Sequence, residues 1–249
     1  MIYPTARNAD TSLQLIATHL PNQLALPTTK EVKEMKLYIA DATCSQAVQV
    51  IANELGLSPE LIHFDVFGKS TSNGSKFADV NSLQYVPVLE LDDEAKTRLT
   101  ETIIIISYLA DQHLEAGLIP KRGTLERVKM DQLLTFIATE IAQKHIPLMR
   151  KLMNADGIAY HTHKLQTAYG LLDAKLADGR AYLMGEQFTV ADAYVWATLW
   201  HERSGVSLDH LKNLNAYIER IETRPAVKRA LKEEAAVVAQ HKAQLAAAA

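Results

Sequence analysis

Val86-Pro87-Val88-Leu89-Glu90-Leu91 is the stretch of sequence that decides the fold of the first half of this chain. A proline at the head of an apolar run is typical of the first residue of a strand, because proline has no N–H to donate inside a central strand. The acidic cluster at 92–94 then makes a turn, and residues 96–99 return as the partner of a hairpin. We therefore expect a strand that starts beside Pro87 and pairs with the segment that follows it.

A strand–helix–strand unit precedes this hairpin. The apolar pattern predicts strands over 36–41 and 61–67, and helical spacing predicts a helix over 45–55. Gly56 stands where the glycine that ends a helix belongs. Two strands joined by a helix within about 30 residues indicate a parallel crossover unit.

A helix over 101–112 follows the hairpin, with Ile103, Ile106 and Leu109 on one face. The order β-α-β and then β-β-α is that of the thioredoxin fold, so we expect an α/β thioredoxin-like N-terminal domain. Pro87 then takes the position of that fold's cis-proline, where the backbone of the preceding residue is free to pair with an extended peptide. Only about 5–6% of X-Pro bonds in folded proteins are cis, and the alternative is that Pro87 only marks the start of a strand.

The sequence after residue 121 has the pattern of helices throughout. Five residues recur at spacings of four, three, four and four, and so share one face of a helix: Met130, Leu134, Ile137, Ile141 and His145. Pro147 is expected to bend or interrupt this helix. Further helices are predicted over about 160–178, 190–203, 209–222 and 226–240, and Thr189 with Asp192 resembles a capping box.

These patterns divide the chain into three parts. Residues 1–34 are interpreted as an appendage of unknown role, which is a leader, an extension from an upstream start codon or a short helix packed on the body. Residues 35–114 form the thioredoxin-like domain, and residues 121–249 form an all-α C-terminal domain.

Composition excludes several classes of protein. A formal net charge of -3 gives no electrostatic reason to bind nucleic acid or anionic membranes. No apolar run approaches the roughly 20 residues that span a bilayer. The single cysteine excludes an intramolecular disulfide and a Cys-rich zinc site, and it fits a reducing compartment such as the cytoplasm. His201-Glu202 begins like a zinc-protease motif, but Gly205 replaces the second histidine, so we expect no metal.

Cys44 is the first candidate for chemistry, because it lies just after the first strand and at the opening of the first helix. Exposed amides and the dipole at a helix N-terminus favour negative charge. We therefore expect a lowered thiol pKa and a nucleophile near neutral pH. The alternative is a buried and inert thiol, which is common for free cysteine.

A second candidate is Thr100-Glu101-Thr102 at the start of the third helix. Free amides at a helix start hold a carboxylate, and the Glu101 carboxylate accepts from an ammonium group. A γ-glutamyl end carries both charges on one carbon. The alternative is ordinary helix capping.

Five segments, taken in order, resemble the glutathione S-transferase family, most closely its bacterial beta class. The match covers about residues 35–235. The segments are Met35-Lys36-Leu37-Tyr38, Cys44-Ser45-Gln46-Ala47, residues 81–87 with Val88-Leu89, Glu101-Thr102 with Tyr108-Leu109-Ala110-Asp111, and Phe188-Thr189-Val190-Ala191-Asp192-Ala193-Tyr194. The resemblance implies a glutathione-binding first domain, a second domain that supplies an apolar pocket for a small hydrophobic electrophile, and a homodimer.

The resemblance also implies roles for residues of the first domain. Cys44 is the active-site cysteine near the glutathione sulfur, and Ser45 is its hydrogen-bonding neighbour. Val86 pairs through its backbone with the cysteinyl part of glutathione, and Pro87 is cis.

The two ends of glutathione are assigned in the same way. Glu101 and Thr102 hold the γ-glutamyl end, and Lys69 lies near the glycyl carboxylate. Candidates for the electrophile pocket are Met149, Met153 and Tyr160.

The sequence departs from the beta class at a His-Lys pair that usually reaches toward the cysteine. Ala142 and Gln143 occupy those positions, and His145 follows one turn later. His145 is therefore a third catalytic candidate beside Cys44 and Ser45. It either compensates for the missing pair or is a satisfied core histidine, and we favour the core interpretation.

Three functions remain open at this point. The first is conjugation of glutathione to hydrophobic electrophiles, which is detoxification chemistry. The second is glutathione-dependent thiol-disulfide or peroxide chemistry through Cys44. The alternative to both is a non-catalytic glutathione-binding, stress or regulatory interaction protein on the same fold.

Overall fold

The structure, a computed structural model, describes residues 35–248. The appendage expected over 1–34 lies outside the described residues. Four strands form one mixed sheet in the order β2-β1-β3-β4. They are β1 (Lys36–Ile39), β2 (Glu60–His63), β3 (Val88–Glu90) and β4 (Arg98–Leu99). β1 pairs in parallel with β2 and antiparallel with β3, and β3 pairs antiparallel with β4, which confirms the thioredoxin order.

The second strand is shorter than the one expected over 61–67. It ends at His63. Phe64 still donates its amide to the Ile39 carbonyl at 2.8 Å, and beyond that it makes an isolated antiparallel bridge with Thr71. The amide of Lys69 donates to the Asp65 carbonyl at 2.8 Å, so the chain has already turned there. This local turn ends the strand although the apolar alternation continues.

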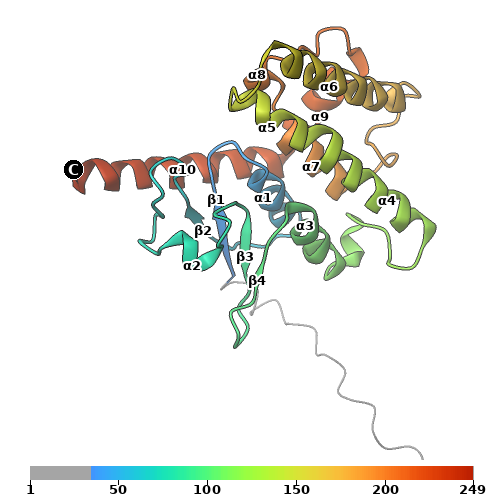
Figure 1. The fold of residues 1–249 in the computed structure, drawn as a ribbon. Coiled ribbons are helices and arrows are strands. Elements are labelled where there is room, and N and C mark those ends of the chain that lie inside the picture. The colour runs from blue at the N-terminus through green and yellow to red at the C-terminus, as the bar shows by residue number, and fades with distance from the viewer. Residues whose placement is uncertain (1–34, 249) are drawn as a thin grey trace, which may run out of the picture.

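The sheet is the middle layer of the N-terminal domain (Figure 1). Its helices are α1 (Ser45–Glu54), α2 (Phe77–Val80) and α3 (Thr102–Asp111), followed by the short turn η2 (Leu114–Ala116). Strand side chains point alternately to opposite faces. Leu37 and Leu89 join the main core with α1 and α3, whereas Tyr38 and Val88 point to a smaller cluster closed by Phe77 of α2.

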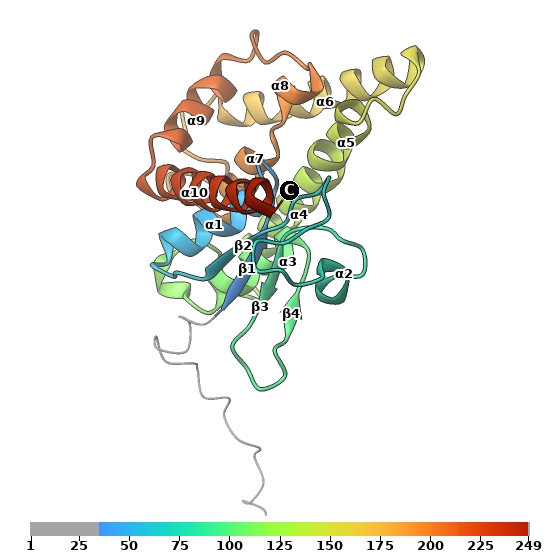
Figure 2. The same cartoon turned by 90° about the vertical axis from the view of Figure 1, so that its left-hand side faces the viewer.

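The rest of the described chain is helical. Its helices are α4 (Leu125–Phe136), the π-helix η3 (Ile137–Ala142), α5 (Gln143–Met149), α6 (Ala155–Leu176), α7 (Val190–Thr198), α8 (His201–Ser204), α9 (Lys212–Glu222) and α10 (Pro225–Ala248). The five residues of the predicted apolar face from Met130 to His145 are each at most 2% exposed. α7 and α10 pack on α1 (Figure 2), so the sheet and the helices share one hydrophobic core. None of the described helices is both long and apolar enough to cross a bilayer.

Two helix predictions need correction. Pro147 does not interrupt its helix, because α5 runs through the proline and ends at Met149, whereas the bend expected there stays a prediction. The irregular part is the π turn of η3 upstream of the proline. The helix predicted over 190–203 is two helices, because α7 ends at Thr198 and α8 begins at His201. The Thr198 hydroxyl donates to the Tyr194 carbonyl at 2.7 Å, a side-chain bond that competes with the helix ladder.

Asp192 confirms the capping box and joins three segments of the helical domain. Its carboxylate accepts from the Thr189 amide at 2.8 Å and the Thr189 hydroxyl at 2.7 Å. It also accepts from the Leu183 amide at 2.9 Å and the Tyr217 hydroxyl at 2.8 Å. Burial raises the pKa of Asp192 although these four donors oppose the shift.

His145 of α5 lies in a satisfied polar network inside the helical domain. Its Nδ1 lies 2.9 Å from the Ser204 hydroxyl oxygen, and its Nε2 faces the Tyr169 hydroxyl. The side chain is fully buried. Burial, with smaller contributions from the nearby His201 and Arg203, lowers the pKa of His145 to about 3. The ring is therefore neutral at physiological pH.

This neutral histidine predicts a pH dependence of stability. The pKa of His145 is about 3 in the folded chain, whereas an unfolded histidine titrates near 6.5. The contribution of His145 to the free energy of unfolding is therefore fully present above about pH 6.5. Below that pH it falls by up to about 1.4 kcal/mol per pH unit, because the unfolded chain takes up the proton first. We expect His145→Gln to remove this slope of one proton and to lower stability at neutral pH. Urea unfolding at several pH values checks this, and equal slopes in both proteins would contradict it.

Candidate functional site

Cys44 stands at the N-terminus of α1, where the end of β1 and the approach to β3 meet. Cys44 is the N-cap residue of α1 and is half-buried. Its thiol donates to the Val86 carbonyl, with 3.6 Å between Sγ and oxygen. The Val86-Pro87 peptide bond is cis, as the fold position of Pro87 predicts. The thiol and the cis-proline strand therefore form one wall of a candidate site.

The start of α3 forms a second wall. The Thr102 hydroxyl lies within hydrogen-bonding reach of the Cys44 thiol. Glu101 precedes the helix with a φ of 64°, a conformation that costs a non-glycine residue about 1–3 kcal/mol. Its carbonyl accepts from the amides of Ile104 and Ile105, both at 3.0 Å, which helps to hold this backbone. The Glu101 side chain remains exposed beside the thiol.

The acidity of Cys44 differs from the sequence expectation. Burial raises the pKa of the Cys44 thiol, and the negative charge of Glu101 raises it further. The hydrogen bond with Thr102 opposes this shift but is the smaller effect. The expectation of a lowered pKa was wrong because the helix N-terminus was considered without the desolvation that the surrounding helices impose. The thiol is protonated at neutral pH in the chain without ligand.

Ser45 is bonded through its hydroxyl to the loop that follows β1. Its side chain is fully buried, and its hydroxyl lies 2.8 Å from the Thr43 hydroxyl and 3.4 Å from the Ala40 carbonyl. These bonds tie the start of α1 to the end of β1. The geometry therefore supports a structural role for Ser45 and does not support its expected place among the catalytic residues.

His145 is likewise not supported as a catalytic residue. Both of its ring nitrogens are engaged by Ser204 and Tyr169, and it has no exposed surface. Of the two residues that replace the family's His-Lys pair, Ala142 is buried and Gln143 is exposed. We therefore leave His145 out of the proposed site.

Lys69 lies on the side of the sheet that carries the cis-proline. It is exposed, and its ammonium stands 5.6 Å from the centre of the Phe64 ring. Phe64 belongs to the small cluster against which Val86 packs. This places Lys69 on the same face as Val86, and its contact with a glycyl carboxylate stays a prediction.

The helical domain contributes Tyr194, which the sequence analysis did not single out. This residue of α7 is buried, and its pKa is raised first by burial and then by the charges of Cys44 and Glu101. Its hydroxyl therefore belongs to the surroundings of the thiol. The signal was in the sequence, because Tyr194 ends the segment that begins at Phe188, but that segment was used for its capping box and for the family resemblance, and Tyr194 was given no role.

The residues expected to line the electrophile pocket lie on α5, on α6 and between these two helices. Met149 and Met153 are half-buried, and Tyr160 is exposed on α6, where it contacts His161 and Lys164. Their role stays a prediction. Within residues 35–248, no three His, Cys, Asp or Glu side chains gather as a metal-binding group.

Family models match both parts of the chain. The glutathione S-transferase N-terminal domain matches residues 33–111, and the glutathione S-transferase C-terminal domain matches residues 140–234. A curated relative, the glutathione S-transferase GstA of Escherichia coli O157:H7, is 31% identical over 201 residues, which is 80% of this chain and 98% of the relative.

Solved structures agree with these matches. A glutathione transferase from Methylococcus capsulatus is 36% identical with a TM-score of 0.77, covering 81% of this chain and 98% of that one. A sphingomonad glutathione S-transferase in complex with glutathione is 33% identical with a TM-score of 0.75, covering 80% and 98%. The bacterial beta class enzyme of Sphingomonas chungbukensis is 32% identical with a TM-score of 0.74, covering 80% and 98%. The chain belongs to the glutathione S-transferase family.

Proposed function

We propose that this transferase binds glutathione in the space between Cys44, Val86 and the start of α3. The observation that carries the proposal is the approach of Cys44 Sγ to the Val86 carbonyl at 3.6 Å beside the cis-proline. Ladder pairing of β3 with β1 stops at Val88, so the backbone of Val86 lies outside the sheet. An extended tripeptide with its cysteine opposite Val86 places its sulfur at Cys44. The glutathione bound to the sphingomonad relative supports this assignment.

The two ends of glutathione then have complementary partners. The first amides of α3 are free to donate to the α-carboxylate of the γ-glutamyl end, since Ile104 and Ile105 are the first residues of α3 whose amides bond the Glu101 carbonyl. The Glu101 carboxylate accepts from the ammonium group on the same carbon. Lys69 is our candidate for the glycyl carboxylate.

The chemistry that this site supports best is conjugation. A protonated Cys44 thiol is a hydrogen-bond donor, and here it stabilises the thiolate of bound glutathione. The proton of glutathione leaves to solvent, and the sulfur forms a bond to an electrophilic carbon as the leaving group departs with its electron pair. Tyr194 of α7 stands beside this point, and the hydrophobic electrophile occupies the side of the helical domain.

Thiol-disulfide chemistry is the second candidate, because Cys44 is a free and half-exposed thiol. In that reaction the Cys44 thiolate attacks the glutathione sulfur of a mixed disulfide between glutathione and a substrate thiol, and the substrate leaves as its thiolate. A second glutathione thiolate then attacks the Cys44–glutathione disulfide, which releases the Cys44 thiolate and glutathione disulfide. This route needs the thiolate, which the raised pKa disfavours. A reduced lone thiol suits a reducing compartment, so we place the enzyme in the cytoplasm.

Replacing the thiol separates these functions. We expect Cys44→Ala to bind glutathione within a few-fold of the unchanged protein and to conjugate aromatic halides about 10-fold more slowly, because one charge-assisted hydrogen bond is lost. Isothermal titration and turnover with glutathione give both values. Unchanged conjugation together with a complete loss of glutathione–disulfide exchange would instead assign the second function. Failure of the unchanged protein to bind glutathione under reducing conditions would favour the non-catalytic alternative.

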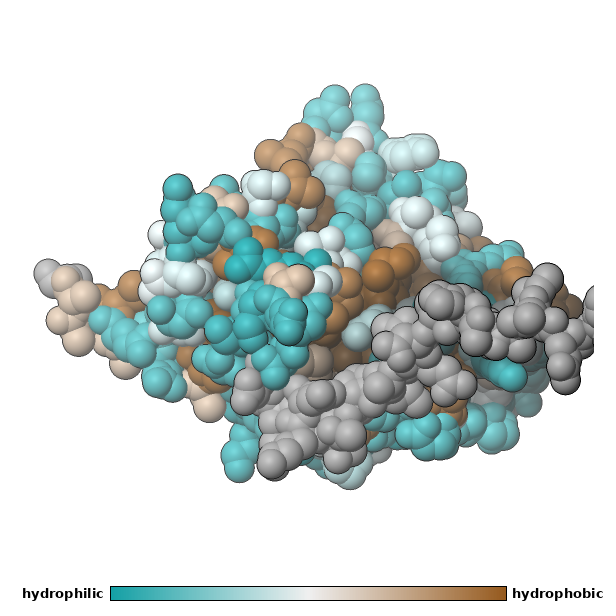
Figure 3. Space-filling model, turned by 90° about the horizontal axis from the view of Figure 1, so that it is seen from below, coloured by the Kyte–Doolittle hydropathy of each residue, from teal (hydrophilic) through white to brown (hydrophobic). Residues whose placement is uncertain are grey.

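We also propose that the enzyme is a homodimer that buries apolar side chains of α3 and α4. Ile104 of α3 and Leu125 and Val128 of α4 are 54–63% exposed. Leu125 and Val128 are three residues apart and so share one helix face. Apolar surface is also visible among polar surface in Figure 3, where the molecule is seen from below. Exposed apolar side chains that cluster are typical of an interface between protein chains.

This interface predicts a specific loss of assembly. We expect Val128→Glu to shift the protein from dimer to monomer in light scattering, because a buried and unpaired carboxylate opposes association. Leu171→Glu on α6 is a matched control, since Leu171 is similarly exposed but lies on another helix. A dimer in both variants, or a monomer in the unchanged protein, would contradict the proposed interface.

A further inference from the structure

Two side chains of the helical domain hold the loop that leads into Cys44. They bond the backbone amide and the backbone carbonyl of one loop residue, Ala42. The Ala42 amide donates to Glu234 Oε1 of α10 at 3.1 Å. The Ala42 carbonyl accepts from Arg203 Nη1 of α8 at 2.6 Å. Ala42 lies only two residues before the thiol, so both bonds reach from distant helices to the active-site loop.

The backbone of Ala42 needs such support. Its φ is 52°, in the left-handed region, which costs an alanine about 1–2 kcal/mol. Without the two bonds the residue is free to return to an ordinary conformation. That return would redirect the following residues and move Cys44 away from the Val86 carbonyl.

Glu234 holds the first turns of α1 as well as the loop. Its Oε1 also accepts from the Gln46 amide group at 2.8 Å, and its Oε2 accepts from the Gln49 amide group at 3.1 Å. Glu234 is only 4% exposed. Burial raises the pKa of Glu234, although the three donors each lower it. Burying a carboxylate at this position therefore costs more free energy than burying an apolar side chain would. One carboxylate thus connects α10 to both segments that flank Cys44.

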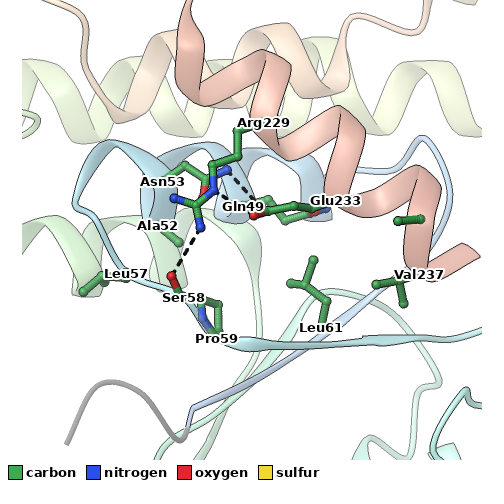
Figure 4. A pocket seen from close by; sticks show the side chains of 11 residues that line it. Gln49, Ala52, Asn53, Leu57, Ser58, Pro59, Leu61, Arg229, Glu233 and Val237 are labelled. Carbon is green, nitrogen blue, oxygen red and sulfur yellow. Dashed lines mark hydrogen bonds and ion pairs between the residues drawn. The ribbon is translucent and has the colours of Figure 1, made fainter. Parts of the chain in front are cut away.

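α10 is itself fixed along its length, so Glu234 has a rigid base. On the N-terminal side of Glu234, Arg229 donates to the Ser58 hydroxyl at 3.3 Å, and Glu233 accepts from the Asn53 amide group of α1 at 3.5 Å. Both residues line a hollow against α1 and β2 (Figure 4). Further along, His241 Nδ1 lies 2.9 Å from His63 Nδ1 of β2. The helix is therefore anchored on both sides of Glu234.

We propose that Glu234 and Arg203 are positioning residues that hold Cys44 Sγ in place through the Ala42 peptide. Neither residue touches the thiol, and their effect passes through the backbone of the loop. The inference rests on the proposed role of Cys44 in glutathione chemistry. Its test measures the thiol itself, which does not require glutathione.

The test is the alkylation rate of Cys44 by iodoacetamide as a function of pH. We expect Glu234→Ala and Arg203→Ala to raise the rate at neutral pH about 5–10-fold, because a displaced thiol is better solvated and its apparent pKa falls toward the usual value of about 8.5. The same variants should lower kcat for conjugation with little change in the KM for glutathione. Arg203 is exposed, so its variant keeps the test possible if Glu234→Ala does not fold.

Two variants separate positioning from a general loss of stability. Glu234→Gln should restore nearly unchanged rates, because its carbonyl can still accept from Ala42 and Gln46. Gln49 Oε1 has no partner among the described residues. If the side-chain amide of Gln49 flips, this oxygen can accept a hydrogen bond from the amide nitrogen that the substitution introduces at position 234. Glu233→Gln, which removes the same charge from the neighbouring residue, should leave the alkylation profile unchanged.

The outcomes are distinct. An unchanged alkylation profile in folded Glu234→Ala and Arg203→Ala would overturn the inference, as would a Glu234→Gln variant as altered as Glu234→Ala. A changed profile in a protein that does not bind glutathione would support the positioning role and reject the proposed function. If the unchanged protein conjugates glutathione normally but the variants have unchanged alkylation profiles, the proposed function is supported and the positioning role is rejected.

Discussion

The burial of α1 between the sheet and the helical domain is the constraint on which the rest of the structure depends. Eight of its ten residues, from Ser45 to Ala52, are buried. A helix covered on so many sides cannot present a polar face to water, and it packs against α3, α7 and α10 at once. These neighbours fix its position, and the thiol of Cys44 at its N-terminus stays half-buried.

The same burial explains the chemistry of the site. A helix N-terminus attracts negative charge, yet desolvation by the packed helices outweighs that attraction and keeps Cys44 protonated. Thr102 and Glu101 come from α3 and Tyr194 comes from α7, so the thiol is surrounded by both domains. The helical domain thus shapes the electrostatics of a site whose backbone belongs to the thioredoxin-like domain.

Much of this arrangement could be predicted from the sequence because it depends on local signals. The cis-proline followed from the place of Pro87 between a crossover and a hairpin, and the buried face of α4 and α5 followed from residue spacing. The parts that could not be predicted depend on distant contacts. The bonds of Ala42 reach Glu234, 192 residues away, and Arg203, 161 residues away. The acidity of Cys44 also depends on burial and on Thr102 and Glu101 at the start of α3, which the local sequence does not specify.

The position of Glu234 in α10, the last helix of the described chain, has a consequence for biosynthesis. A thioredoxin-like domain at the front of a chain can begin to fold while the ribosome is still translating the rest, since domains generally fold as units in order of synthesis. The Ala42 peptide nevertheless lacks both of its distant partners until α8 and α10 have emerged. The nascent protein therefore contains its cysteine before the geometry around it is complete, and the Ala42 bonds form only after α10 has left the ribosome.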